Sequence, residues 1–478
     1  MHFQGSKTAL CLALILICVP SATVRADDKD ANAKAVDALF ATWDKPDSPG
    51  CALGVIKDGK LIYARGYGAA NLEHDIRITT KSVFDIGSTS KQFTAASIAL
   101  LAAQGKLSID DDIRRFIPEL PDYGKKITLR NLLNHTSGIR DYLGLMSLVG
   151  INFDDTTSDD DALRLIVRQK ALNFDPGEEH LYSNSGYFLL SIIVKRASGK
   201  SLRQFAEENI FGPLGMKHTH YHDDHTLIVP LRAQAYAPKR GGGFRIDMSN
   251  FEQTGDGAVM TTVEDLLLWD QNFYDAKVGG RAMYDQLLTQ GVLNNGKKLS
   301  YAEGLVVEDY KGLKLISHGG AWAGYRAELI RFPEQKFSVI CLSNLATFNP
   351  SRLARQVADV YLADQFKPPA QSAQSQPPNR SEAPERKDPI KLTSVQLAEY
   401  AGNYYSEELD VTYEMFVDGE HLILRIAGRP QSQSMTIARK DGFAVPGVSV
   451  NFSRAEQGRI SGFSLNAGRV KGILFVKK

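Results

Sequence analysis

Cysteine is scarce in this chain, with 4 residues among 478. Two of the four lie in an N-terminal segment that we expect to be removed, which leaves Cys51 and Cys341. A pair of cysteines excludes a disulfide framework as the main support of the fold. Each lies in an apolar stretch typical of a strand, so the sequence favours two buried thiols. One bridge between them is also allowed in an oxidising compartment.

An excess of charge of either sign is also missing. Lysine and arginine number 56 against 55 acidic residues, which gives a formal net charge of +1. Such a balance provides no overall field that would attract nucleic acid or an anionic membrane surface. We therefore expect a small-molecule or peptide substrate as the partner, no nucleic acid and no cofactor. The sequence does not determine the oligomeric state.

Long hydrophobic runs are absent too. The apolar run at residues 9–20 is about 12 residues long, whereas a bilayer-spanning helix needs about 20. Lys7 precedes this run, and Val24-Arg25-Ala26 follows it with residues of the size that signal peptidase reads. We expect residues 1–26 to be a cleaved signal peptide, the protein to be periplasmic or secreted, and no stable membrane anchor to remain. A retained anchor, or lipid attachment at Cys18, is the alternative.

What the chain does contain is enough apolar material, 43% of its residues, for a large core. Apolar segments predict an N-terminal hairpin and, after a long and mostly helical stretch, three further strands. The expected fold class is α+β, with an antiparallel sheet flanked by helices, a helical insert and a substrate cleft between sheet and helices. The predicted strands span residues 51–56, 61–65, 313–318, 325–332 and 337–343.

The composition changes near the C-terminus. Residues 367–390 are rich in Pro, Ser and Gln and have no apolar period, which is typical of a linker. We expect a hydrolase domain at residues 27–366, followed after the linker by a small all-β domain at residues 391–478. Its short strand-like runs are separated by Asp-Gly turns and suggest a barrel.

The first chemical motif is Ser88-Thr89-Ser90-Lys91, at the start of an Ala-rich segment predicted to be a buried helix. The spacing of three places Ser88 and Lys91 on one face of a helix. A serine hydroxyl is a weak nucleophile until a base takes its proton, and a desolvated lysine amine can serve as that base. We predict that Ser88 is the nucleophile and Lys91 its activator.

Two further segments carry candidate site residues. In Tyr182-Ser183-Asn184, residues two apart point the same way if the segment is extended. Tyr182 would then relay protons, and Asn184 would hold the substrate and Lys91. In the third segment, His318 and Gly320 end a predicted strand, where glycine lets a substrate approach the strand edge. The N–H of Ala321 could pair with that of the serine as an oxyanion hole.

These three segments, in this order, resemble the serine β-lactamase and penicillin-binding protein superfamily, in particular its class C-like branch. That branch also contains D-aminopeptidases, D-alanyl-D-alanine carboxypeptidases and esterases. The resemblance covers about residues 36–363. Four side motifs support it: Leu133-Asn134-His135-Thr136-Ser137-Gly138, Phe174-Asp175-Pro176-Gly177, Pro213-Leu214-Gly215-Met216 and Gly255-Asp256-Gly257.

The resemblance implies roles for particular residues. Ser88 resembles the family nucleophile, Lys91 its activating lysine, and Tyr182 and Asn184 the second motif. His318 stands where class C β-lactamases usually have a lysine, and His-x-Gly is similar to the motif of D-aminopeptidases and several esterase-like relatives. A histidine is cationic only near or below pH about 6.5 unless its pKa is shifted. Cleavage of a D-amino-acid peptide or an ester is therefore favoured over efficient β-lactam hydrolysis.

The segment from Tyr400 to Tyr405 resembles the start of the lipocalin-like domains appended to such hydrolases, and whether this domain covers the cleft is left open. Two alternative functions also stay open. A penicillin-binding sensor would be acylated at the same serine without turnover. A zinc-dependent hydrolase would use His220, His222 and His225, since alternating histidines can converge on zinc. We favour a polar surface loop for this histidine segment and expect no metal site.

Overall fold

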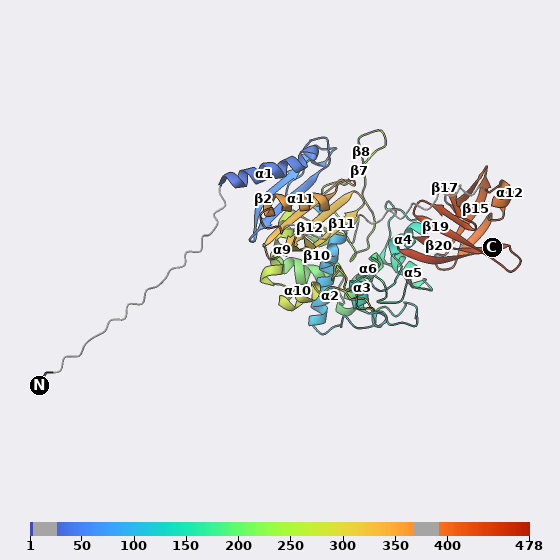
Figure 1. Ribbon diagram of the computed structural model, residues 1–478, viewed down its shortest axis with the longest axis horizontal. Helices are drawn as coiled ribbons and strands as arrows, with labels where there is room; N and C mark the ends of the chain where they lie inside the picture. Colours follow the sequence, from blue (N-terminus) through green and yellow to red (C-terminus); the bar gives the residue numbers. More distant parts are fainter. Residues whose placement is uncertain (3–25, 368–391) are drawn as a thin grey trace.

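The computed structural model describes residues 1–2, 26–367 and 392–478 (Figure 1). The predicted signal peptide, residues 1–26, and the predicted linker, residues 367–390, lie almost wholly outside the described residues. Their boundaries, and those of the two domains, therefore stay predictions. Within the described ranges, no helix has both the length and the hydropathy that a membrane span requires.

The centre of the larger part is a six-stranded antiparallel sheet with the order β10-β11-β12-β13-β1-β2. The N-terminal hairpin joins the late strands through β1 and β13, in a register that runs from Cys51 opposite Ser343 to Lys57 opposite Phe337. Cys51 and Cys341 are free, buried thiols on these two strands. The strands are β1 Cys51–Lys57, β2 Lys60–Tyr67, β10 Val306–Tyr310, β11 Leu313–Trp322, β12 Tyr325–Phe332 and β13 Phe337–Ser343.

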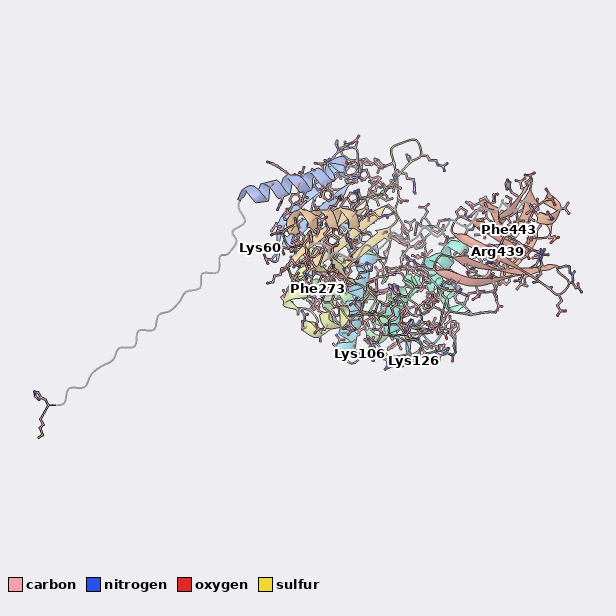
Figure 2. The ribbon with its side chains drawn as sticks, viewed as in Figure 1. Lys60, Lys106, Lys126, Phe273, Arg439 and Phe443 are labelled. Carbon is pink, nitrogen blue, oxygen red and sulfur yellow. The ribbon has the colours of Figure 1, made fainter. Side chains whose placement is uncertain are left out.

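Helices cover both faces of this sheet (Figure 1). On one face, α1 (Ala26–Phe40) and α11 (Pro350–Leu362) bury Phe40 and Val357 against the strands. On the other face, α9 (Val263–Asp275) packs so closely that a Cβ on Gly54 would lie 2.4 Å from Val263 Cγ1. The buried Arg331 lies over the ring of Phe273 from this helix and pairs with Asp270 at 2.7 Å. Figure 2 labels Phe273 in the larger part of the molecule.

The helical insert lies between the two halves of the sheet in sequence, as predicted. Its helices are α2 Lys91–Ala103, α3 Leu129–Leu133, α4 Tyr142–Leu148, α5 Asp159–Val167, α6 Asn184–Ser198, α7 Leu202–Ala206, α8 Gly212–Leu214 and α10 Gly280–Leu287. Short strands pair with one another as β3-β4, β5-β9-β6 and β7-β8. They are β3 Ala69–Asn71, β4 Ile76–Arg77, β5 Phe84–Asp85, β6 His220–Tyr221, β7 Tyr236–Pro238, β8 Phe244–Ile246 and β9 Val259–Thr261. The helices α2 and α6 are almost fully buried, which fits their apolar sequences. The predicted α+β fold class is confirmed.

The C-terminal part forms a closed barrel of eight antiparallel strands, which confirms the prediction of a small all-β barrel. Its interior is aromatic, with Tyr404, Phe443 and Phe463 almost fully buried. A short helix, α12 (Ser394–Ala398), precedes the barrel. The strands are β14 Gly402–Ser406, β15 Val411–Asp418, β16 His421–Ile426, β17 Ser432–Arg439, β18 Gly442–Val445, β19 Val448–Arg454, β20 Ile460–Ala467 and β21 Val470–Lys477.

The barrel docks on the helical insert beside α4 and α5 (Figure 1). The guanidinium of Arg140 pairs with Glu408 at 2.5 Å, and the two side chains are 1% and 7% exposed. The hydroxyl of Tyr413 donates to the carbonyl of Leu148 at 2.7 Å. The two parts therefore share a buried polar interface within the described chain.

Candidate active site

Ser88 lies on a 3-10 turn, Gly87–Ser90, directly before α2, whose first residue is Lys91. The sequence predicted one helix for both residues. The spacing of three still places them on one side, because a 3-10 helix has three residues per turn. Lys91 Nζ lies 3.1 Å from Ser88 Oγ. The serine is half-buried, whereas the lysine is fully buried.

The buried amine of Lys91 has three oxygen neighbours: Ser88 Oγ, Asn184 Oδ1 at 3.0 Å and the carbonyl of Asp256 at 2.5 Å. A neutral amine has two N–H groups and one lone pair. The amide oxygen and the carbonyl can only accept, so they take the two N–H groups. In that neutral form the lone pair would face the serine hydroxyl, which is the geometry a general base requires. In the charged form the amine donates to all three oxygens, Ser88 Oγ included.

The phenol of Tyr182 lies on the same side of the cleft. Lys91 Nζ is 4.9 Å from the centroid of its ring, and the ring of His135 packs against it in a tilted arrangement, with the centroids 4.0 Å apart. His135 Nδ1 also accepts a hydrogen bond from the N–H of Ser183 at 3.2 Å, which fixes the loop. The hydroxyl of Tyr182 is buried and has no hydrogen-bond partner in the described chain. It is therefore free to bond to a reacting substrate.

Asn184 differs from the prediction of an extended segment. Ser183 is extended, but Asn184 is the first residue of α6, and its N–H donates to Asp141 Oδ2 at 2.7 Å. The sequence did not reveal this start, because Asp141 lies far away in the chain. The Asn184 side chain still contacts Lys91, as predicted.

The edge of β11 lies against the turn that carries the serine. A Cβ on Gly320 would lie 1.8 Å from the carbonyl oxygen of Ile86, and a Cβ on Gly87 would lie 2.7 Å from the nitrogen of Ala321. This close approach brings the backbone of the predicted oxyanion hole to the nucleophile. A cleft of about 1000 Å³ opens here, lined by Ser88, Tyr182, Asn184, His318, Gly320 and Ala321 among others.

His318 does not have the environment of a cation. Burial, reinforced by the charge of Lys91, lowers its pKa to about 4. Nδ1 of the ring lies 2.7 Å from the carbonyl oxygen of Gly319, and Nε2 lies 3.1 Å from the hydroxyl oxygen of Tyr301. Since a carbonyl only accepts, Nδ1 carries the proton and Nε2 accepts from the tyrosine. The ring is thus neutral near pH 7, and its assignment to substrate binding stays a prediction.

Two buried carboxyl groups lie behind the nucleophile. Burial raises the pKa of both Asp85 and Asp256 to about 7, and for Asp256 the charge of Lys91 opposes that rise. Asp256 accepts from the hydroxyl of Tyr142 at 3.2 Å, and both carboxyls line a second cavity of about 390 Å³. In the described chain, Lys91 contacts the backbone carbonyl of Asp256 and forms no ion pair.

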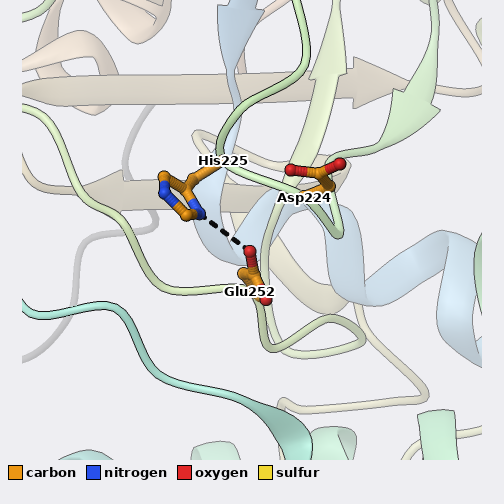
Figure 3. Close-up of side chains that lie close together, drawn as sticks. All are labelled: Asp224, His225 and Glu252. Carbon is orange, nitrogen blue, oxygen red and sulfur yellow. Dashed lines mark hydrogen bonds and ion pairs between the residues drawn. The ribbon is translucent and has the colours of Figure 1, made fainter.

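The histidine segment was the candidate for a zinc site. His220 Nε2 lies 3.4 Å from His222 Nδ1, and burial lowers the pKa of both rings to about 4. His225 turns instead to Glu252, at 2.8 Å (Figure 3). Across residues 26–367 and 392–478, the only group of three possible metal ligands is Asp224, His225 and Glu252. The three histidines of the zinc hypothesis therefore do not converge on one point.

Sequence reasoning missed two residues of this region. Tyr301 holds His318, and Arg469, from the turn between β20 and β21, lines the cleft that contains Ser88. Neither has a local signal, because Tyr301 lies in a loop and Arg469 follows a Gly in an ordinary hairpin turn. Only the docking of the barrel brings Arg469 to the site.

Comparison with known proteins agrees with the family resemblance that the sequence motifs indicated. A family model described as Beta-lactamase matches residues 35–363. The chain is 28% identical over 421 residues to penicillin-binding protein 4* of Bacillus subtilis, covering 84% of this chain and 89% of that protein. It is 31% identical over 318 residues to a D-aminopeptidase of Cereibacter sphaeroides, covering 66% of this chain and 60% of that enzyme, less than two thirds of its length.

Solved structures share the fold. A penicillin-binding protein homologue from Pyrococcus abyssi is similar with a TM-score of 0.63 and 23% identity, over 94% of this chain and 98% of that one. The D-amino acid amidase from Ochrobactrum anthropi SV3 is similar with a TM-score of 0.59 and 21% identity, over 71% of this chain and 99% of that one. Since the family model also covers most of the chain, this protein belongs to the beta-lactamase family.

Proposed function

We propose that this protein is a serine hydrolase that cleaves an amide or ester through an acyl-enzyme on Ser88. The observation that carries the proposal is the environment of the Lys91 amine. Two acceptors that cannot donate hold its N–H groups, and its third neighbour is the serine hydroxyl. This arrangement provides a base at the nucleophile without a metal or a cofactor.

In the proposed reaction, Ser88 Oγ attacks the substrate carbonyl carbon while its proton passes to Lys91. The oxyanion is held by backbone N–H groups of Ser88 and Ala321. Tyr182 gives its proton to the leaving amine or alcohol as the bond to carbon breaks, and Lys91 returns a proton to Tyr182. Water then attacks the acyl-enzyme, which releases the acid and restores the serine hydroxyl.

The substrate class follows from the relatives and the cleft. Curated relatives include D-aminopeptidases, and the similar folds include a D-amino acid amidase. We propose an amide or ester of a D-amino acid as the substrate class, with β-lactams as poor substrates. The neutral His318 supports this choice, because it does not replace the permanent cation of a Lys-Thr-Gly motif. We also propose export to the periplasm or outside the cell, as the N-terminal segment predicts.

Replacement of the nucleophile tests the mechanism. Ser88→Ala should lower kcat for p-nitrophenyl acetate and for a D-amino amide by about a thousandfold or more. Ser97→Ala is the matched control, since Ser97 lies on the same helix and its hydroxyl only donates to the carbonyl of Phe93. Hydrolysis that persists in purified Ser88→Ala at the rate of the control would refute the acyl-enzyme.

A second candidate is a penicillin-binding protein that is acylated but does not turn over. This second candidate is supported by the similarity to penicillin-binding protein 4*, which covers 89% of that protein. A fluorescent penicillin should label both kinds of protein at Ser88. For the hydrolase we expect steady turnover of the ester after any burst, whereas the second candidate would release one equivalent of product and stop.

A further inference from the structure

The turn between β20 and β21 of the barrel reaches the cleft. The backbone carbonyl of Arg469 accepts a hydrogen bond from the side-chain amide of Asn173 at 2.8 Å. Asn173 in turn accepts from the N–H of Lys471 at 2.8 Å. A Cβ on Gly144 would lie 2.8 Å from the side chain of Val470, so the turn packs tightly against α4. Arg469 is thus placed by fixed backbone contacts on both of its sides.

The guanidinium of Arg469 lies over Tyr182. Its central carbon is 4.7 Å from the centroid of the Tyr182 ring. The side chain is 46% exposed, lines the same cleft as Ser88 and makes no hydrogen bond to the described chain. Its nearest carboxylate, Asp141, is 3.7 Å away and already accepts from the N–H groups of Asn184 and Gly144. Arg469 and Asp141 thus form a long ion pair without a hydrogen bond, so the N–H groups of the guanidinium can still bind a ligand.

The other charged groups of the cleft are engaged. Arg245 pairs with Asp247 at 2.9 Å, and Arg326 donates to the carbonyls of Ala323 and Tyr325. His318 is neutral near pH 7, and Lys91 is buried beneath the serine. Arg469, by contrast, has only the long ion pair with Asp141, and its side chain makes no hydrogen bond within the described chain.

We propose that Arg469 binds a carboxylate on the leaving-group part of the substrate, so that the barrel completes the active site. The leaving-group side follows from the position over Tyr182, the residue that would protonate the leaving group. A guanidinium binds a carboxylate through two parallel N–H···O bonds, which fixes orientation as well as charge. The inference rests on the proposed function, because it assigns the substrate of that same site.

The test compares two esters that differ only in the charge of the leaving group, 4-carboxyphenyl acetate and 4-carbamoylphenyl acetate. Arg469→Gln should lower kcat/KM for the carboxylate ester by about 10- to 100-fold, the usual worth of a charge-assisted hydrogen bond. The carbamoyl ester should change by less than about twofold. Arg469→Lys keeps the positive charge but not the two parallel N–H donors of the guanidinium, and should retain part of the preference for the carboxylate ester.

Lys471→Ala is the matched control from the same hairpin, because its amine lies 3.5 Å from Glu179 and does not line the cleft. It should leave both esters unchanged. An equal loss on both esters in Arg469→Gln would show a purely structural role, and no loss on either would show that no carboxylate binds there. Either result overturns the inference. Hydrolysis that survives in Ser88→Ala, or none by the intact protein, would instead refute the proposed function.

Discussion

The charges around the nucleophile decide which substrates the site can hold. The ring that replaces the usual lysine of the third motif, His318, is neutral near pH 7, and its two nitrogens already bond to Gly319 and Tyr301. A positive charge lies in the same cleft on Arg469, whose ion pair with Asp141 is long, at 3.7 Å. A carboxylate should therefore be recognised from the barrel rather than from β11.

This charge distribution predicts how activity depends on pH. The ratio of kcat/KM for 4-carboxyphenyl acetate to that for 4-carbamoylphenyl acetate should stay constant from about pH 5.5 to 8. Over that range His318, whose pKa is about 4, is already neutral, and Arg469 stays charged. If a cationic His318 held the carboxylate, the ratio would fall about tenfold per pH unit above its pKa. Steady-state rates at constant ionic strength decide between the two.

At the scale of single residues, the sequence indicated side chains that lie together in the fold, whereas their catalytic roles stay predictions. It named Ser88, Lys91 and Asn184, whose side chains the structure brings within hydrogen-bond distance. It left open the charge of His318, because that charge depends on burial by residues distant in the chain. Arg469 could not be found at all, since its surroundings belong to another part of the molecule.

At the scale of elements, the site depends on two backbone segments in direct contact. The edge of β11 and the turn before α2 approach so closely that Gly320 has no room for a side chain. The strands β12 and β13 match their predicted bounds, whereas β11 runs on to Trp322 beyond the predicted end at His318. Glycine is rare in strands and weakens a sequence-based strand prediction. Because two glycines follow His318, the sequence did not predict that β11 continues along the edge of the cleft.

Gly320→Ala tests this contact. The new Cβ would lie 1.8 Å from the carbonyl oxygen of Ile86, so either the strand or the nucleophile turn must shift. We expect kcat/KM to fall by about a hundredfold, the usual effect of displacing reacting groups by about 1 Å. Gly319→Ala is the matched control, because its Cβ would come closest to the carboxylate end of the Glu328 side chain, at 2.7 Å, and would lie 3.6 Å from the nearest backbone atom. Equal losses in the two variants, each checked for folding by circular dichroism, would contradict the role of Gly320.

At the scale of the whole molecule, the barrel contributes Arg469 to the lining of the cleft that contains Ser88. The predicted sheet and barrel follow from local patterns of apolar residues, and both are confirmed. How the barrel sits on the insert could not be predicted, because it depends on pairs such as Arg140 and Glu408, 268 residues apart. In the sequence, neither the arginine nor the glutamate carries a pattern that indicates burial or such a pair.

The docking itself can be tested through that pair. Glu408→Ala would leave the buried Arg140 without its carboxylate, which should cost about 3–5 kcal/mol of stability. Asp410→Asn is the control from the same loop, because asparagine tolerates the positive φ of 54° at this position and the lost ion pair with Arg168 is worth at most about 1 kcal/mol. Denaturant unfolding should show a lower midpoint for Glu408→Ala alone.

The Glu408→Ala variant should also lose its preference for the carboxylate ester, since a loosened barrel no longer holds Arg469 in the cleft. A stable Glu408→Ala protein that keeps this preference would mean that the barrel is docked by other contacts.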